Sequence, residues 1–314
     1  MYDSLREGGL GIIGAVISVF ILMFIGYATK KLRLLRVDDV SVLSTIIVYL
    51  TLPCFVFEAI YNYRQPLPLS IAKVPIIGLG VILVVLVIAY LIGLALKIDR
   101  PTIGGIILAA GFGNTAFIGY PVIQSALGKN ALMPAALYDE LAMAFPLYTL
   151  GMVIAASFAG EKVDRKQLLK MASAPAVLAI PIALILRPYQ LPMPILKTIG
   201  YLANATVALA MLSIGLSLSS KSIKGLAIPV LATCALKLAV LPFITYFAAR
   251  AAGITGLNHT VTVLQAGMPS AVMSCVVASK FGANQRFVAA VVFISTLLSI
   301  ITIPLTLLIL DANP

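Results

Sequence analysis

Two clusters of helix-breaking and polar residues interrupt apolar stretches that are long enough to cross a membrane. The first cluster, Gly113-Asn114-Thr115, lies within residues 103–127, which are 25 residues without a charge. The second, Gly267-Met268-Pro269-Ser270, lies within residues 259–281. Irregular backbone at membrane depth must be buried in protein or line a wet cavity. Matched breaks at that depth are typical of the binding site of a secondary transporter.

Such breaks in a helix can bind an anion. Interrupting a helix frees N–H groups at the start of its second segment, and these groups carry partial positive charge. We expect Thr115 and Ser270 to cap the two new helix starts, and Pro269 suits a break because it has no N–H to lose. Asn114 adds amide donors that can hold a carboxylate, and two helix starts meeting at the midplane would form an anion site. The alternative is a packing kink with close contact of small residues.

Three ionisable side chains fall inside predicted spans, where a buried charge costs several kcal/mol and marks a functional hypothesis. Asp139 and Glu140 lie about 12 Å into the span 131–157, and Lys237 lies halfway along the span 226–249. One acid could pair with Lys237, and a purely structural ion pair is one interpretation. The other is a relay in which an acid alternates between its protonated and ionised forms. Neighbours on a helix point about 100° apart, so we expect only one acid to face the core.

Most of the chain is apolar. Of the 314 residues, 61% are hydrophobic and 11% are charged, with a mean hydropathy of +1.09. Soluble domains carry about 25% charged residues, so the composition indicates a polytopic protein of the lipid bilayer with no soluble domain. Apolar runs predict ten spans, at about residues 8–29, 41–60, 74–96, 103–127, 131–157, 168–186, 195–218, 226–249, 259–281 and 287–309. Glu58, near the outer end of its span, is expected to be solvated or to lie in a vestibule.

The formal charge of +11 follows the predicted topology. Of the 22 Lys and Arg residues, 14 lie in the odd-numbered loops and one, Lys237, lies inside a span. By the positive-inside rule the odd loops are cytoplasmic, so both termini face outward from the inner membrane. The excess charge therefore reflects topology and does not indicate a nucleic-acid partner.

The two halves of the chain resemble each other weakly. An offset of 154 residues places the fourth span on the ninth. The identical pairs are Gly113 and Gly267, Val122 and Val276, Ser125 and Ser279, Gly128 and Gly282, and Asn130 and Asn284. Five spans per half is an odd number, so the second half must be inverted relative to the first. We predict two inverted five-helix repeats, residues 1–157 and 158–314, with broken and crossing fourth and ninth helices.

Three segments resemble the auxin efflux carrier family, whose bacterial members carry small organic acids. Gly113–Pro121 is similar to the family's G-N-T-x-x-x-G-x-P, and Ala266–Ala271 followed by Phe281-Gly282 is similar to its M-P-S and downstream aromatic-Gly. Ser295–Ser299, with Pro304 after it, is similar to the family's final span. The resemblance runs from about residue 20 to residue 305.

The resemblance implies a ten-helix fold in which spans 4 and 9 break and cross and a mobile panel rocks against the core. It implies a substrate carboxylate near the crossing, with Asn114 at the family's binding Asn. It also implies an acid at the position of Asp139, which we therefore favour over Glu140. Met268 departs from the plant members, which have polar residues near the second break, so auxin is not the expected substrate.

We predict a carrier of organic anions that works by alternating access and is not an enzyme. We expect it to need no cofactor and no bound metal ion. The binding residues are the two clusters, and the coupling residues are Asp139, Glu140, Lys237 and Gln265. Proton coupling is the leading hypothesis. Sodium coupling is the alternative, because Asn114, Thr115 and Gln265 offer oxygen ligands beside unwound backbone. A passive uniporter or channel on the same scaffold also stays open, as does a homodimer.

Overall fold

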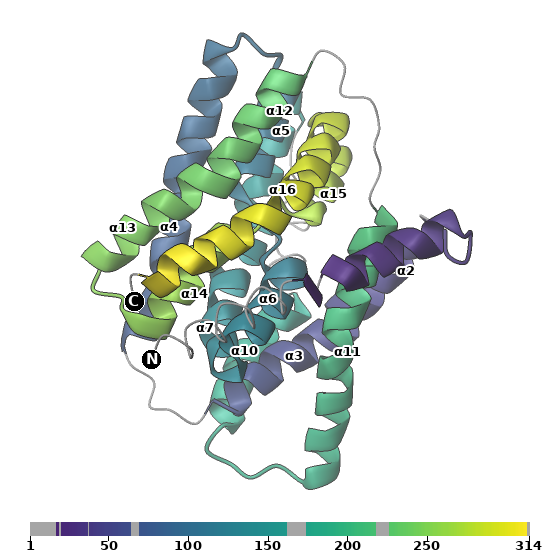
Figure 1. Cartoon of the computed structure of the whole chain (residues 1–314), viewed down its shortest axis with the longest axis vertical. Coiled ribbons are helices and arrows are strands. Elements are labelled where there is room, and N and C mark those ends of the chain that lie inside the picture. The colour runs from purple at the N-terminus through teal and green to yellow at the C-terminus, as the bar shows by residue number, and fades with distance from the viewer. Residues whose placement is uncertain are drawn as a thin grey trace. The chain divides into compact units, whose positions relative to one another are not determined.

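Every regular element among the described residues of the computed structural model is a helix (Figure 1). The structure describes residues 17–18, 20–36, 38–63, 69–161, 174–217 and 226–312. Within these ranges the one extended pairing is an isolated antiparallel bridge between Gly113 and Ser270. The predicted all-α class is confirmed for this part of the chain.

Six helical segments are long and apolar enough to cross a membrane. They are Asp39–Tyr61, Ile71–Ala95, Lys129–Ala159, Met193–Leu216, Ala227–Ala251 and Gln285–Leu310. Each coincides with one of the ten predicted spans to within three residues at either end. The protein is therefore a multi-pass integral membrane protein.

The four other predicted spans differ for two reasons. Residues 103–127 and 259–281 form shorter helices because the chain breaks inside each of them. Residues 8–29 and 168–186 lie partly outside the described residues, and of the second span the structure gives α10, the apolar helix Pro175–Leu186. The number of ten spans therefore stays a prediction.

The chain forms two compact units that do not follow the halves of the sequence. Unit 1 comprises Met1–Pro68, Ala116–Leu137 and Ser173–Leu218, and unit 2 comprises Leu69–Thr115, Tyr138–Ala172 and Ser219–Pro314. Each unit takes segments from both predicted repeats, 1–157 and 158–314. The inverted symmetry between the repeats stays a prediction.

Unit 1 packs its helices closely through glycine. Its labelled helices are α2 (Asp39–Ile46), η1 (Ile47–Thr51), α3 (Leu52–Tyr61), α6 (Tyr120–Leu127), η3 (Lys129–Ala131), α7 (Leu132–Leu137), α10 and α11 (Met193–Ser217). A Cβ atom on Gly215 of α11 would lie 1.9 Å from the Met23 carbonyl oxygen. Only glycine permits this approach, as is common where membrane helices meet.

Unit 2 holds the larger set of helices. These are α4 (Leu69–Ala95), α5 (Arg100–Gly111), η4 (Tyr138–Ala144), η5 (Leu147–Gly151), α8 (Met152–Ala159), α12 (Ala227–Ala235), η6 (Leu236–Val240), α13 (Leu241–Ala251), α14 (Gly256–Ala266), α15 (Val272–Lys280) and α16 (Gln285–Ala312). Asp99 caps α5 by accepting the Thr102 N–H at 3.1 Å. Asn284 donates to the Thr102 hydroxyl at 2.7 Å, which ties the start of α16 to the start of α5.

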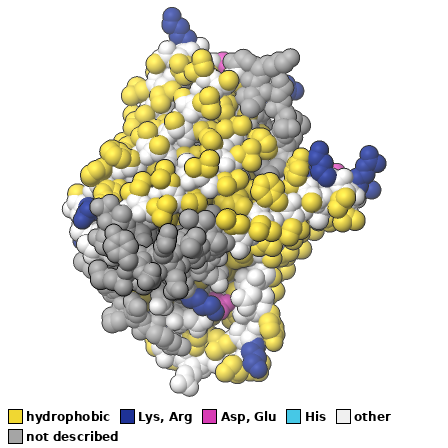
Figure 2. All heavy atoms as spheres, viewed as in Figure 1, with side chains coloured by type: hydrophobic (Ala, Val, Ile, Leu, Met, Phe, Trp, Pro, Cys, Tyr) yellow, Lys and Arg dark blue, Asp and Glu magenta, His cyan; other side chains and the backbone are white. Residues whose placement is uncertain are grey.

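The outer surface of unit 2 is suited to lipid. Hydrophobic side chains cover the visible face over α13 and α16 (Figure 2). Phe243 and Ile301 expose 64% and 69% of their surface. A contiguous apolar surface of this kind is unfavourable in contact with water. Such faces are expected where a helix contacts hydrocarbon.

Candidate functional site

The two predicted chain breaks are present in unit 2. Helix α5 ends at Gly111, Phe112 is extended, and the π-helix η2 (Thr115–Gly119) follows. Helix α14 ends at Ala266, and α15 begins only at Val272. Glycine, proline and short polar side chains at both places explain why neither helix continues.

The two breaks pair with each other through their backbones. The Asn114 N–H donates to the Pro269 carbonyl at 2.7 Å, and the Ala271 N–H donates to the Phe112 carbonyl at 3.0 Å. These bonds flank the Gly113–Ser270 bridge. Buried backbone groups that lose their helical partners must find others, and here each break supplies them to the other. The predicted meeting of the two breaks is confirmed, and we call this region the crossover.

Ser270 does not cap the second helix start as predicted. Its hydroxyl donates to the Ala109 carbonyl at 2.7 Å, while Ala271 is the N-cap of α15 and makes no side-chain cap bond. The physical reason is the end of α5, whose last carbonyls have no partner within the helix. Ser270 also donates its N–H to the Ser295 hydroxyl at 3.1 Å, so it connects the crossover to α16.

Lys237 lies at the crossover. Its Nζ donates to the carbonyl of Ala266, the last residue of α14, at 2.7 Å. A Cβ atom on Gly113 would lie 2.9 Å from the same Nζ, so the lysine reaches both breaks. The C-terminal end of a helix carries partial negative charge, which favours a cation there. This explains how Lys237 is tolerated with 0% of its surface exposed.

The comparisons with known proteins identify the family. A family model described as membrane transport protein matches residues 11–307. The chain belongs to this family. It is the family of the auxin efflux carriers, so the resemblance seen in the sequence is confirmed.

Two archaeal relatives of this membrane transport protein are similar over nearly their whole length. An uncharacterized transporter of Methanocaldococcus jannaschii is 31% identical over 298 residues, which cover 92% of this chain and 96% of the relative. An uncharacterized transporter of Methanothermobacter thermautotrophicus is 29% identical over 297 residues, which cover 94% of this chain and 97% of the relative.

The name of a bacterial relative includes a substrate. It is a protein of Rhizobium meliloti named as a candidate malonate transporter, 28% identical over 317 residues, which cover 93% of either chain.

Asp139 contacts the crossover of this membrane transport protein directly. The Thr115 hydroxyl donates a hydrogen bond to Asp139 Oδ1. The expected capping role of Thr115 stays a prediction. Both side chains are buried. The predicted pairing of Asp139 or Glu140 with Lys237 stays a prediction.

Glu140 is buried as well, contrary to the expectation that only one of the adjacent acids would face the interior. Asp139 exposes 3% and Glu140 exposes 1% of its surface. The reason is that η4 is covered by both α4 and α14. Among the described residues, Glu140 Oε1 and the neighbouring Tyr138 hydroxyl have no hydrogen-bond partner.

The charged residues share a local feature that the sequence did not reveal. Asp139 and Glu140 lie in the π-helix η4, Lys237 lies in the π-helix η6, and Thr115 begins η2. Single π-helical turns inside α-helices are frequent at functional sites, because they displace side chains from the regular helical positions.

Three other predicted or neighbouring side chains complete the crossover. Gln265 and Met268 are fully buried, and the Met268 N–H donates to the Gln265 carbonyl at 3.3 Å. The Gly113 N–H donates to the sulfur of Met143 at 3.3 Å. The sequence did not identify Met143 as part of the crossover, because a methionine in an apolar span does not stand out from its neighbours. Ser295 lies within a segment that resembles the family.

Proposed function

We propose that the protein is a secondary active transporter of small organic anions and that the crossover binds a substrate carboxylate. Family membership supports transport as the activity. The observation that carries the site is the paired break, which brings the buried polar residues Asn114, Thr115 and Ser270 together inside an apolar unit. The two predicted five-helix repeats and alternating access belong to this proposal.

Two side chains at the crossover, those of Asn114 and Lys237, favour an anion. Asn114 exposes 5% of its surface, and its backbone is held by Pro269. Lys237 places its amino group beside Gly113. A carboxylate that accepts bonds from an amide and an ammonium would form charge-assisted hydrogen bonds, which are roughly twice as strong as neutral ones. The name of the Rhizobium meliloti relative supports the same class, because malonate is a small dicarboxylate.

Coupling to protons is the leading mechanism, with Asp139 as the proton carrier. Its carboxylate accepts a hydrogen bond from Thr115, the first residue after the break. Protonation would remove one negative charge from the site and change the bond to Thr115, so a proton and a substrate anion would favour each other. Sodium coupling is the second candidate, because Thr115, Asn114 and Gln265 bring oxygen atoms to the same unwound backbone.

Uptake into proteoliposomes tests the function. With labelled malonate, we expect saturable uptake that exceeds equilibrium when a pH gradient is imposed, acid outside. Uptake that never exceeds equilibrium would favour a passive uniporter or channel. Accumulation driven by a sodium gradient at fixed pH would favour the sodium mechanism and contradict proton coupling.

Two isosteric variants test the coupling residue. We expect Asp139→Asn to abolish the effect of the pH gradient on net uptake and to retain exchange of internal for external malonate, which moves no net proton. Glu140→Gln is the matched variant, since it removes a neighbouring buried acid. Proton-driven uptake that survives in Asp139→Asn and fails in Glu140→Gln would transfer the role to Glu140.

A further inference from the structure

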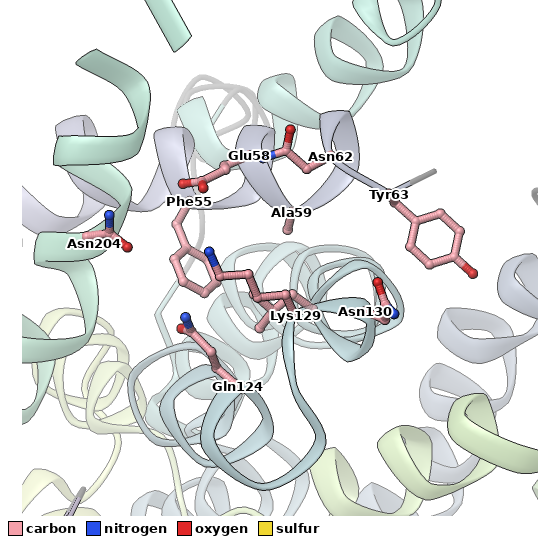
Figure 3. A pocket seen from close by; sticks show the side chains of 10 residues that line it. Phe55, Glu58, Ala59, Asn62, Tyr63, Gln124, Lys129, Asn130 and Asn204 are labelled. Atoms are coloured by element: carbon pink, nitrogen blue, oxygen red, sulfur yellow. The ribbon is translucent and has the colours of Figure 1, made fainter. Parts of the chain in front are cut away.

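Unit 1 contains a small cavity that shares no lining residue with the crossover. Its volume is about 60 Å³, and α3, α6, η3, α7 and α11 all contribute to its wall. Its lining residues are Phe55, Glu58, Ala59, Asn62, Tyr63, Gln124, Lys129, Asn130, Leu132 and Asn204 (Figure 3). Every one of them belongs to unit 1, so the cavity is a property of that unit alone.

An acid and a lysine line the cavity together. Glu58 lies on α3 and Lys129 begins η3. Figure 3 shows the polar ends of Glu58, Lys129 and Gln124 beside the ring of Phe55. Among the described residues, no ion pair or hydrogen bond joins the Glu58 and Lys129 side chains. Two opposite charges therefore share one small space without neutralising each other through direct contact.

The floor and the rim of the cavity differ. Phe55 and Leu132 are buried and give an apolar floor. Glu58 is half-buried, whereas Lys129, Asn62 and Asn204 are exposed at the rim. A ligand could enter from the rim, and the exposed lysine would reach it without losing all of its hydration. The small volume excludes bulky side groups.

The charge pattern selects among ligand classes. A simple anion would gain from Lys129 and be repelled by Glu58, and a simple cation would meet the opposite balance. A small molecule with both charges satisfies both groups at once, with its ammonium toward Glu58 and its carboxylate toward Lys129. The amides of Gln124 and Asn204 can donate to the carboxylate or accept from the ammonium.

We propose that this cavity binds a small zwitterion of the amino-acid class, such as glycine or β-alanine. The inference goes beyond organic-anion transport at the crossover and does not depend on it. The alternative occupant is water alone, which would make the cavity a hydrated vestibule.

Binding to the purified protein tests the proposal. Glycine and β-alanine are compared with acetate and methylammonium, each of which keeps one charge, by calorimetry at neutral pH. We expect binding of the zwitterions and at least about tenfold weaker binding of either single-charge analogue. Glu58→Gln and Lys129→Gln should each weaken the binding of the zwitterions by about tenfold or more. Lys280→Gln, an exposed lysine of unit 2, is the control and should change nothing.

A charge exchange separates recognition from damage to the fold. The double variant Glu58→Lys with Lys129→Glu keeps one acid and one base at the cavity, so it should bind glycine better than either single variant does. Asn114→Ala should leave glycine binding unchanged, because the crossover is a different site. Absence of glycine binding to the wild-type protein would overturn the proposal in favour of a hydrated vestibule. Binding of acetate as tight as that of glycine would overturn it in favour of an anion site.

Discussion

The crossover of unit 2 and the cavity of unit 1 each combine a carboxylate with a lysine, yet they hold these charges differently. At the crossover, Lys237 and Asp139 are buried, and each has a protein partner, the Ala266 carbonyl and the Thr115 hydroxyl respectively. At the cavity, Glu58 is half-buried and Lys129 is exposed, and within the described residues no hydrogen bond or ion pair joins their side chains. The protein supplies hydrogen-bond partners to the buried groups, whereas Glu58 and Lys129 stay accessible from outside the protein.

The difference shows what a broken helix contributes. A regular helix in a membrane consumes its own carbonyls, so a lysine beside it finds no acceptor. Where α14 stops at Ala266, a carbonyl with partial negative charge becomes available, and Lys237 binds it. The break in α14 thus supplies the acceptor that holds the buried amino group of Lys237 at the crossover.

The largest predicted difference between the two regions is the effect of replacing their lysines on the free energy of unfolding. Lys237→Ala should lower the free energy of unfolding by about 2–5 kcal/mol, because it leaves a cavity and an unpaired Ala266 carbonyl. Lys129→Ala should change it by less than about 0.5 kcal/mol, as is usual for exposed side chains. Denaturation in detergent micelles measures both. Equal effects of the two variants would contradict the account.

Lys237→Met separates the charge from the packing. Methionine fills a similar volume, so this variant avoids the cavity that alanine leaves and keeps only the cost of the unpaired Ala266 carbonyl, about 1–3 kcal/mol. We expect a folded protein that is less destabilised than Lys237→Ala and that fails to bind malonate. Normal malonate binding in this variant would assign Lys237 a structural role only.

A smaller effect is expected for the asparagines of the two regions. Asn114→Ala should remove about 1.5–3 kcal/mol of the binding free energy of malonate, the value of a hydrogen bond to a charged group. Asn204→Ala, at the cavity of unit 1, should leave malonate binding intact. Ligand-dependent thermal stabilisation of the two variants measures the difference. Unchanged affinity in Asn114→Ala would return that residue to a purely structural role.

The smallest effect concerns two serines that bond to the end of α5. Ser270→Ala should lower the free energy of unfolding by about 1 kcal/mol, since its hydroxyl bonds to the Ala109 carbonyl at 2.7 Å. Ser274→Ala should have a weaker effect, because its hydroxyl lies 3.5 Å from the Leu108 carbonyl. If the two variants were equally destabilised, the bond from Ser270 would not be the one that secures the break.

The sequence predicted where the chain breaks and not how the broken ends are satisfied. Glycine, proline and asparagine in an apolar span show that a helix cannot continue, so Gly113–Thr115 and Gly267–Ser270 were found. Which donor reaches which orphaned carbonyl depends on the packing of distant helices. Ser270 was therefore assigned a capping role that it does not have, and the contact between Lys237 and Ala266 was not foreseen.

The division into units was also outside the reach of the sequence. Hydropathy locates spans one at a time, which is why six of them match to within a few residues. Which spans pack together is decided by contacts such as that of Gly215 with Met23, and a glycine in an apolar run does not name its neighbour. The burial of Glu140 beside Asp139 was missed for the same reason, since η4 is covered by two helices that are remote in sequence.

Counterflow in proteoliposomes tests the central claim most directly, that the crossover carries the substrate. Vesicles are loaded with unlabelled malonate and diluted into labelled malonate, and the label inside is followed over time. We predict transient accumulation of label by the wild-type protein and by Asn204→Ala, and none by Asn114→Ala at equal reconstitution. Full counterflow in Asn114→Ala, or flux through the wild type that rises linearly with malonate and never saturates, would contradict the account.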